Sequence, residues 1–272
     1  MKKKKVIDYR DIEDRIQPVS EIKEPVCMVI YGRPGTGKTT LAASFPTPAL
    51  FIDCLEKGSE SISDVKGVSV IKVKDWDDII KVYWLIKKNP NKFKSVIIDT
   101  LSNAQNLAIM KVMEEHNKEV DRAKLGNWGT MTKQMWGQVS TLVKGIIWDF
   151  RDLPLEKVFI AHERAFTFDD DEDDDNEKIA PNIGPSLTQS TVVVLNAAVN
   201  IIGNTYIKEK ITKIRDKKTK KITVKKEKLY CLRIGPNPIY ATKIRKPKKI
   251  QIPDTIIDPS YEDLIDIVSG KG

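Results

Sequence analysis

The sequence predicts an α/β fold, a mostly parallel twisted sheet with flanking helices, and two observations support this prediction. Short apolar runs with strand character alternate along the chain with longer helical patterns, and such alternation indicates parallel strands joined by crossover helices. A glycine-rich turn follows the first apolar run and opens a helix, which is the context of a phosphate-binding loop. The chain has 272 residues, enough for one full core, so we expect one main domain.

The predicted elements follow one another closely in the first two thirds of the chain. Apolar runs predict strands at 26–31, 49–53, 68–73, 95–99, 157–162 and 197–202. Helical patterns predict helices from the glycine-rich turn to about 45, and at 77–88, 103–116, 130–150 and 185–194. Asp75 is expected to cap the helix at 77–88, because its carboxylate can accept a bond from a free N–H of the first turn.

Charge is distributed unevenly. Two strand patterns, 205–214 and 222–234, flank a lysine-rich turn and predict a C-terminal basic β-hairpin. Residues 208–228 hold eleven lysines or arginines against three acids, whereas residues 169–177 hold eight acids. The basic run favours a polyanionic partner, although each run taken alone can also be an exposed, solvated surface.

The composition bounds the domain organisation and the compartment. We expect an N-terminal basic segment at 1–25, a core at 26–253 that includes the hairpin at 203–234, and a tail at 254–272 with a short helix. No apolar run approaches the roughly 18 residues of a membrane span, and no apolar stretch follows the basic start, so neither a membrane span nor a secretory signal is expected. Three widely spaced cysteines suit buried, reduced thiols of a cytoplasmic protein and suggest no metal cluster.

The glycine-rich turn matches the pattern G-x-x-x-x-G-K-[ST] and is called the P-loop below. Its backbone N–H groups would face the phosphates of a nucleotide at the positive end of a helix. Lys38 would reach the β- and γ-phosphates, and the Thr39 hydroxyl would bind Mg²⁺. An ordinary glycine-rich turn is the alternative, and the strand before it and the helix after it argue against that. The expected nucleotide-binding residues are Gly32, Arg33, Pro34, Gly35, Thr36, Gly37, Lys38, Thr39 and Thr40.

Three further side chains are candidates for the chemistry of hydrolysis. Asp99 ends an apolar strand, where a second carboxylate can hold the Mg²⁺ shell through water. Glu56 follows the second strand and is the leading candidate to orient or deprotonate the attacking water, ahead of Glu60. His162 ends the fifth strand, at the sheet edge where ligands bind in open α/β folds, and could sense the γ-phosphate. The alternatives are surface acids for the glutamates and a structural hydrogen bond for the histidine.

The chain resembles the RecA-like ATP-binding proteins of bacteriophages, some of which act as single-strand annealing or recombination proteins. The resemblance runs over about 26–253 and rests on Ile30–Thr40 with Leu50–Asp53, Val96–Thr100, Asn127–Gly129, Val158–Glu163 and Tyr240–Arg245. It implies a RecA-like P-loop NTPase fold and an ATPase that uses ATP and Mg²⁺ and is stimulated by single-stranded DNA. Such a protein would act in the cytoplasm, that of the host cell if it is phage-encoded.

The resemblance also implies a catalytic role in trans for Lys243 and Arg245. In this family a Lys-x-Arg element reaches the γ-phosphate held by a neighbouring subunit, where positive charge stabilises the transition state. A homo-oligomer with ATP at the subunit interface would follow. Alternatively, both residues simply join the basic surface formed with Lys246, Lys248 and Lys249.

Two departures from the family pattern are visible. The family usually has Asp-x-Glu, whereas Asp53-Cys54-Leu55-Glu56 has one residue more. The second DNA-binding loop would contain the acids of 169–177, which repel a phosphate backbone, so its flank at Arg164 and the hairpin lysines would supply the contacts instead. Trp128 could stack on a base or be a core aromatic. The expected DNA contacts are Arg122, Lys124, Trp128, Arg164, Lys217, Lys218, Lys220 and Lys221.

Three other functions compete with the recombination ATPase. A ring or helicase-loading ATPase of the AAA+ kind would carry a C-terminal helical lid, whereas the chain after 202 has strand patterns and one short final helix. A small-molecule kinase would need a lid and an acceptor pocket. A nucleotide-gated DNA-binding module with negligible hydrolysis remains open because of the additional residue before Glu56.

Overall fold

A computed structural model describes residues 12, 15–18, 24–117, 131–166, 183–215, 222–246 and 249–269. Its strands are β1 (Cys27–Gly32), β2 (Ala49–Asp53), β3 (Val68–Lys72), β4 (Ser95–Asp99), β5 (Glu156–Ala165), β6 (Ile183–Pro185), β7 (Ile201–Arg215), β8 (Ile222–Arg233), β9 (Lys243–Ile244) and β10 (Thr255–Ile257). Its helices are α2 (Lys38–Ala43), the 3₁₀ helix η2 (Gly58–Ile62), α3 (Trp76–Lys88), α4 (Leu101–Asn117), α5 (Lys133–Arg151), α6 (Gln189–Ala198) and α7 (Tyr261–Ser269).

One sheet organises the molecule, in the strand order β10-β8-β7-β1-β5-β4-β2-β3. The strands from β7 to β3 run parallel to one another, and β8 and β10 continue the sheet, with β8 antiparallel to β7 and β10 antiparallel to β8. The predicted α/β fold with a mostly parallel sheet is therefore confirmed. β1 lies in the interior of the sheet, with β5 on one side and β7 on the other, and β5 separates it from β4.

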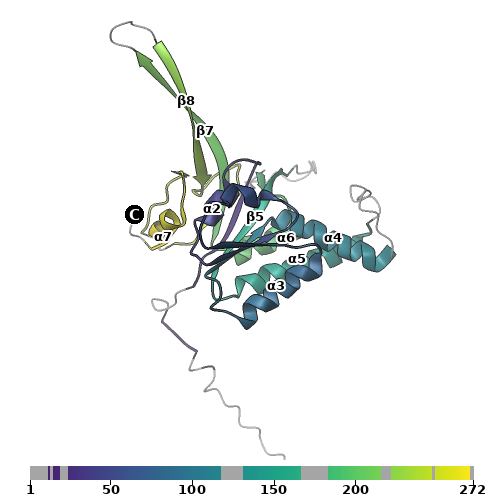
Figure 1. Ribbon diagram of the computed structural model, residues 1–272. Helices are drawn as coiled ribbons and strands as arrows, with labels where there is room; N and C mark the ends of the chain where they lie inside the picture. Colours follow the sequence, from purple (N-terminus) through teal and green to yellow (C-terminus); the bar gives the residue numbers. More distant parts are fainter. Residues whose placement is uncertain are drawn as a thin grey trace, which may run out of the picture.

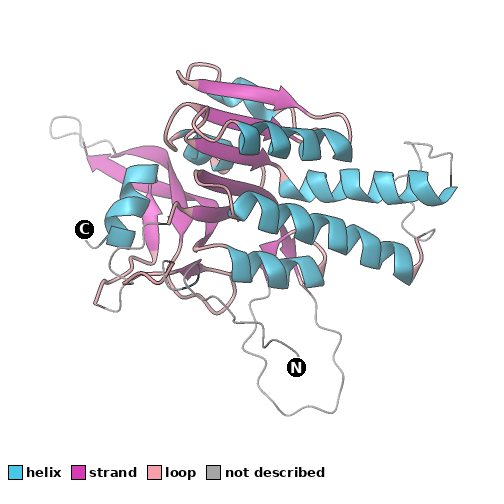
Figure 2. Cartoon of the chain, turned by 90° about the horizontal axis from the view of Figure 1, so that it is seen from below, coloured by secondary structure: helices cyan, strands magenta, loops and turns pink. Residues whose placement is uncertain are grey.

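Helices cover both faces of this sheet (Figures 1 and 2). Successive side chains of a strand point to opposite faces. On β1, Val29 and Tyr31 belong to the core beneath α3, α4, α5 and α6, whereas Met28 and Ile30 belong to the core beneath α2, η2 and α7. Both faces of β1, β2 and β4 are thus buried, which explains why these strands are continuous apolar runs in the sequence, whereas β3 at the end of the sheet is mostly exposed.

Side chains at their N-termini start the long helices. Asp75 accepts a hydrogen bond from the backbone N–H of Asp78 at 2.8 Å and so caps α3, as the sequence predicts. Thr132 caps α5 in the same way, accepting from the N–H of Met135 at 3.2 Å. These caps fix where α3 and α5 begin over the sheet.

Two predicted boundaries in the C-terminal half are wrong. The strand predicted at 197–202 begins only at Ile201, because α6 continues to Ala198. It is also continuous with the strand predicted at 205–214, because β7 pairs with β1 up to Thr205 and with β8 from Asn204 onward. The helix predicted at 185–194 begins later, at Gln189, because Ile183–Pro185 forms β6 against β5. β7 and β8 extend together beyond the sheet as a two-stranded projection, called the arm below (Figure 1).

The C-terminal tail packs into the core. β10 pairs with β8, and the rings of Phe45 and Tyr261 lie 4.8 Å apart between centroids. Leu264 of α7 is fully buried in the core formed by α2 and the sheet. Residues 255–269 therefore contribute to the same hydrophobic core as the P-loop helix.

We predict that Leu264→Ala lowers the free energy of unfolding by about 2–5 kcal/mol, because it removes a buried side chain and leaves a cavity. Chemical denaturation measures this change. The exposed neighbour Glu262 serves as the matched control, and Glu262→Ala should stay within about 0.5 kcal/mol of the parent. Equal, small effects of both substitutions would show that α7 is not part of the core.

Candidate nucleotide-binding site

The P-loop connects the carboxyl end of β1 to the first turn of α2. Gly35 and Gly37 have φ angles of 76° and 85°, in the left-handed region that glycine adopts without strain. A Cβ on Gly32 would lie 2.4 Å from the Thr205 hydroxyl oxygen and 2.5 Å from the Thr205 carbonyl oxygen. Only glycine fits at this point, because β7 passes directly against the loop.

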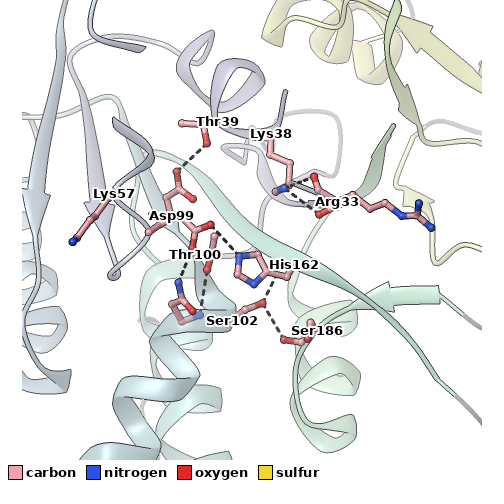
Figure 3. Close-up of polar contacts among 12 residues, drawn as sticks. Arg33, Lys38, Thr39, Lys57, Asp99, Thr100, Ser102, His162 and Ser186 are labelled. Atoms are coloured by element: carbon pink, nitrogen blue, oxygen red, sulfur yellow. Dashed lines mark hydrogen bonds and ion pairs between the residues drawn. The ribbon is translucent and has the colours of Figure 1, made fainter. Parts of the chain in front are cut away.

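The two P-loop side chains expected to meet phosphate and metal lie at the start of α2 (Figure 3). Lys38 Nζ donates hydrogen bonds to the carbonyl oxygens of Gly32, at 3.0 Å, and Arg33, at 2.8 Å. Burial lowers the pKa of Lys38, and the carboxylates of Asp99 and Glu56 act against this shift. The hydroxyl of Thr39 donates to Asp99 Oδ2 at 3.1 Å.

Asp99 is a buried carboxyl group in a negatively charged environment. Burial, with the nearby charges of Glu56 and Asp53, raises its pKa to about 6, against the opposing hydrogen bond from Thr39 and the charge of Lys38. A cation beside this carboxyl group would favour its ionised form and offset the repulsion. The chemistry of the oxygens of Thr39 and Asp99 suits Mg²⁺, which is typically held by one or two carboxylates together with substrate phosphates.

Asp53 shapes the loop that presents Glu56. Its Oδ1 accepts from the backbone N–H groups of Glu56, at 2.8 Å, and Lys57, at 3.1 Å. Leu55 and Lys57 both have positive φ angles, 65° and 56°. The residue that is additional to the family pattern is thus accommodated in a tight turn closed by the Asp53 carboxylate. Its other oxygen, Oδ2, is buried and has no hydrogen-bond partner in the described part of the chain.

Glu56 is held by two side chains from different elements. Asn103 of α4 donates to Glu56 Oε2 at 2.6 Å, and His162 Nε2 lies 3.1 Å from Glu56 Oε1. In Figure 3, Thr39 lies above Asp99 and His162 lies below it. The backbone N–H of His162 donates to the hydroxyl of Ser102 at 3.0 Å. The structure therefore brings Asp99, Glu56 and His162 together beside the P-loop, as the sequence predicts, while their catalytic roles stay predictions.

The other flank of the P-loop is tied to the base of the arm. Thr36 and Thr205 share a hydrogen bond between hydroxyls at 2.7 Å, and Arg33 pairs with Glu163 at 3.3 Å. Asn204 donates to the same Glu163 at 3.1 Å and accepts from Arg233 at 2.6 Å. This chain of contacts connects the loop to both strands of the arm.

A cavity of about 650 Å³ runs along the P-loop and is large enough for a nucleotide. Besides the loop, it is lined by Glu56, Gly58, Ser61 and Asp99 on one side and by Thr205, Tyr230, Cys231, Asp258 and Pro259 on the other.

Sequence reasoning missed several residues of this site. Asp53 carries a detectable signal, because it ends a strand as Asp99 does, and the two are register partners in neighbouring strands. Asn103, Thr205 and Tyr230 carry no such signal, because each reaches the site only through pairing or packing of distant segments.

The predicted trans-acting residues lie at the opposite edge of the sheet. Lys243 pairs in register with Ile202, near the amino end of β7, and its Nζ donates to the carbonyl oxygens of Asn196 and Val199 at the end of α6. Arg245 is exposed and donates to the carbonyl oxygen of Ala197 at 3.0 Å. Neither residue therefore lies beside the P-loop of its own subunit, and the role in trans stays a prediction.

Most of the predicted DNA contacts lie outside the described residues. These are Arg122, Lys124, Trp128, Lys217, Lys218, Lys220 and Lys221, and the acidic run 169–177 also lies outside the described residues. Arg164 is described: it is exposed near the end of β5, and its guanidinium lies 5.5 Å from the ring centroid of Phe166.

The fold and the site define the class of a P-loop nucleotide-binding ATPase. The chain belongs to the AAA domain family, whose model matches residues 24–245. Among the described residues no cluster of three or more His, Cys, Asp or Glu side chains could hold a metal alone, and no described helix is long and apolar enough to cross a membrane.

Comparison with solved structures gives distant likenesses. The RadB recombinase is 16% identical with a TM-score of 0.36, covering 66% of this chain and 74% of its own. The flagellar accessory protein FlaH from Methanocaldococcus jannaschii is 11% identical with a TM-score of 0.34, covering 93% of this chain and 92% of its own. No curated protein matches the chain.

We predict that Lys38→Ala abolishes nucleotide binding or turnover and leaves the fold intact, because Lys38 would contact the β- and γ-phosphates. Equilibrium binding of Mg-ATP and the rate of phosphate release measure the first effect, and circular dichroism measures the second. Normal ATP turnover in a folded Lys38→Ala variant would contradict the assignment of this loop as the phosphate-binding loop.

Proposed function

We propose that this chain is a RecA-like ATPase that hydrolyses Mg-ATP, assembles head to tail, and binds single-stranded DNA to promote annealing or recombination. One observation supports the proposal above all. Lys38, Thr39 and Asp99 lie together at one end of the P-loop, next to Glu56, whose two carboxylate oxygens are each contacted by another side chain. No comparison bears on a phage origin.

The arrangement supports hydrolysis rather than binding alone. Lys38 would neutralise charge on the β- and γ-phosphates, and Mg²⁺ held by Thr39 and Asp99 would stabilise charge on the same oxygens. Glu56 would accept the proton of the water that attacks the γ-phosphorus. Because Asn103 and His162 fix both oxygens of Glu56, this carboxylate would be oriented before the nucleotide binds.

The arm supports the DNA part of the proposal. Exposed lysines lie on both faces of the arm: its register puts Lys208, Lys210 and Lys225 on one face, and Lys226 and Lys228 on the other, which also carries apolar side chains. A basic, projecting element attracts a phosphate backbone.

The positions of the site and of Arg245 support a head-to-tail assembly. The P-loop lies at the carboxyl edge of the parallel strands, and Arg245 is exposed at the amino edge. A subunit stacked on the next one would therefore bring its Arg245 toward the neighbour's nucleotide. Heterologous contacts of this kind form closed rings or open filaments.

A second candidate follows from the family. The AAA domain match favours a ring or helicase-loading ATPase. In the described part of the chain, however, β7–β10 and the nine-residue helix α7 stand where a helical lid would be expected. An ATPase rate unchanged by single-stranded DNA would favour this second candidate.

We predict that single-stranded DNA stimulates ATP hydrolysis and that the stimulation fades from low to moderate salt, because phosphate contacts release counterions. Replacing Lys208, Lys210 and Lys225 by Gln should reduce the salt slope of DNA binding by about 2, since each phosphate that is no longer neutralised lowers the slope by roughly 0.7. Fluorescence anisotropy of a labelled oligonucleotide measures it. The control replaces Lys66, Lys88 and Lys94 by Gln, because these lysines are also exposed but lie away from the arm. Equal slopes in both variants would exclude the face of the arm that carries Lys208, Lys210 and Lys225 as a DNA-binding surface.

We predict that Arg245→Ala binds ATP and loses most turnover, because the charge that it supplies to the neighbour's γ-phosphate is removed. Glu56→Gln should also bind ATP without hydrolysing it. Mixing the two inactive variants should restore part of the activity, because some interfaces then combine an intact Glu56 with an intact Arg245. Phosphate release in mixtures of varied ratio measures the rescue, and its complete absence would count against a shared site.

A further inference from the structure

The nucleotide cavity extends to both flanks of the P-loop strand. β4 and β2 lie on one flank of β1 and supply Asp99 and Glu56, whereas β7 and β8 lie on the other and supply Thr205 and Tyr230. The segment after β10 joins the second flank, because the backbone N–H of Asp258 donates to the carbonyl oxygen of Tyr230 at 2.6 Å. The cavity thus has two chemically different ends.

The end of the cavity that is lined by Asp99 and Glu56 is suited to the terminal phosphates of the nucleotide. Thr39 and Asp99 would hold Mg²⁺ beside the terminal phosphates, and Glu56 would meet the attacking water. The P-loop lies along the middle of the cavity and would hold the remaining phosphates. The nucleoside must therefore extend toward the second flank, where Tyr230 and Pro259 line the cavity.

Tyr230 has the properties of a stacking residue. The residue is 42% exposed, although its ring borders the P-loop: Tyr230 Cδ1 lies 3.3 Å from the position that a Cβ would take on Gly37. The next residue, Cys231, is buried. The ring therefore lies at the point where β8 leaves the arm and enters the sheet. An aromatic ring that is open on the cavity side can take a nucleobase on its face.

We propose that the Tyr230 ring, with Pro259 beside it, forms the nucleobase subsite of this chain. The inference rests on the proposed function, because it assumes that the P-loop holds a nucleoside triphosphate. It assigns the base to the root of the arm, so that one ligand contacts the P-loop and β8 together. Thr205 of β7 contacts Thr36, and both strands of the arm therefore begin at the nucleotide site.

The test compares two ligands that share their phosphates, Mg-ATP and magnesium tripolyphosphate, which lacks the nucleoside. Tyr230→Ala should weaken ATP binding about tenfold, within the range measured for loss of base stacking, and should leave tripolyphosphate binding within about twofold. Tyr230→Phe should keep the ATP affinity, because it keeps the ring. Isothermal titration calorimetry of the full chain measures these affinities.

Ile211→Ala is the matched control, because Ile211 is exposed on the same face of the arm but does not line the cavity. It should change neither affinity. Equal weakening of both ligands by Tyr230→Ala, or no weakening of either, would overturn the subsite. An intact preference for ATP that depends on Tyr230, together with an absence of hydrolysis or DNA stimulation, would count against the proposed function and not against the subsite.

Discussion

Gly32 and Thr205 approach each other so closely that no side chain fits between them, and the site depends on this contact. It brings β7 against the P-loop, and the hydroxyl pair of Thr36 and Thr205 then fixes the loop to that strand. Since β5 lies on the opposite side of β1, the loop stands between two different groups of strands. One group supplies the acids and the other supplies the arm.

The acidic flank shows how backbone geometry and electrostatics combine. Asp53 uses one oxygen to close the turn before Glu56, and its charge helps to raise the pKa of Asp99. The charges of Glu56 and Asp53 disfavour the ionised form of Asp99, and a metal cation beside Asp99 would favour it. A site of this kind favours Mg²⁺ together with the nucleotide, because the metal offsets the repulsion that the fold creates.

Most described side chains of the arm beyond the sheet are exposed to solvent. An isolated two-stranded hairpin is marginally stable in water, and here the base of the hairpin is strengthened by the sheet. The Arg233 guanidinium lies 4.3 and 4.0 Å from the ring centroids of Tyr206 and Tyr240 and is bonded to Asn204. These contacts end where the strands leave the sheet. The base of the arm is fixed beside the nucleotide site, and the rest of the arm is exposed. This arrangement is suited to contact with a partner outside the core.

The sequence by itself determined the strand–loop–helix of the P-loop, the mostly parallel sheet, the cap at Asp75 and the placement of Asp99 at a strand end. The P-loop, the cap and the end of the strand at Asp99 are local features, defined by periodicity and by hydrogen bonds within a few residues, and the parallel sheet follows from the alternation of strands and helices along the chain. The sequence did not determine that α6 begins only after β6, or that β7 is one continuous strand. Pairing between distant strands decides both. Only the tertiary structure placed Asn103 on Glu56, Tyr230 at the P-loop and Arg245 at the far edge. These residues are separated from their neighbours in space by long stretches of chain, and no local pattern encodes such contacts.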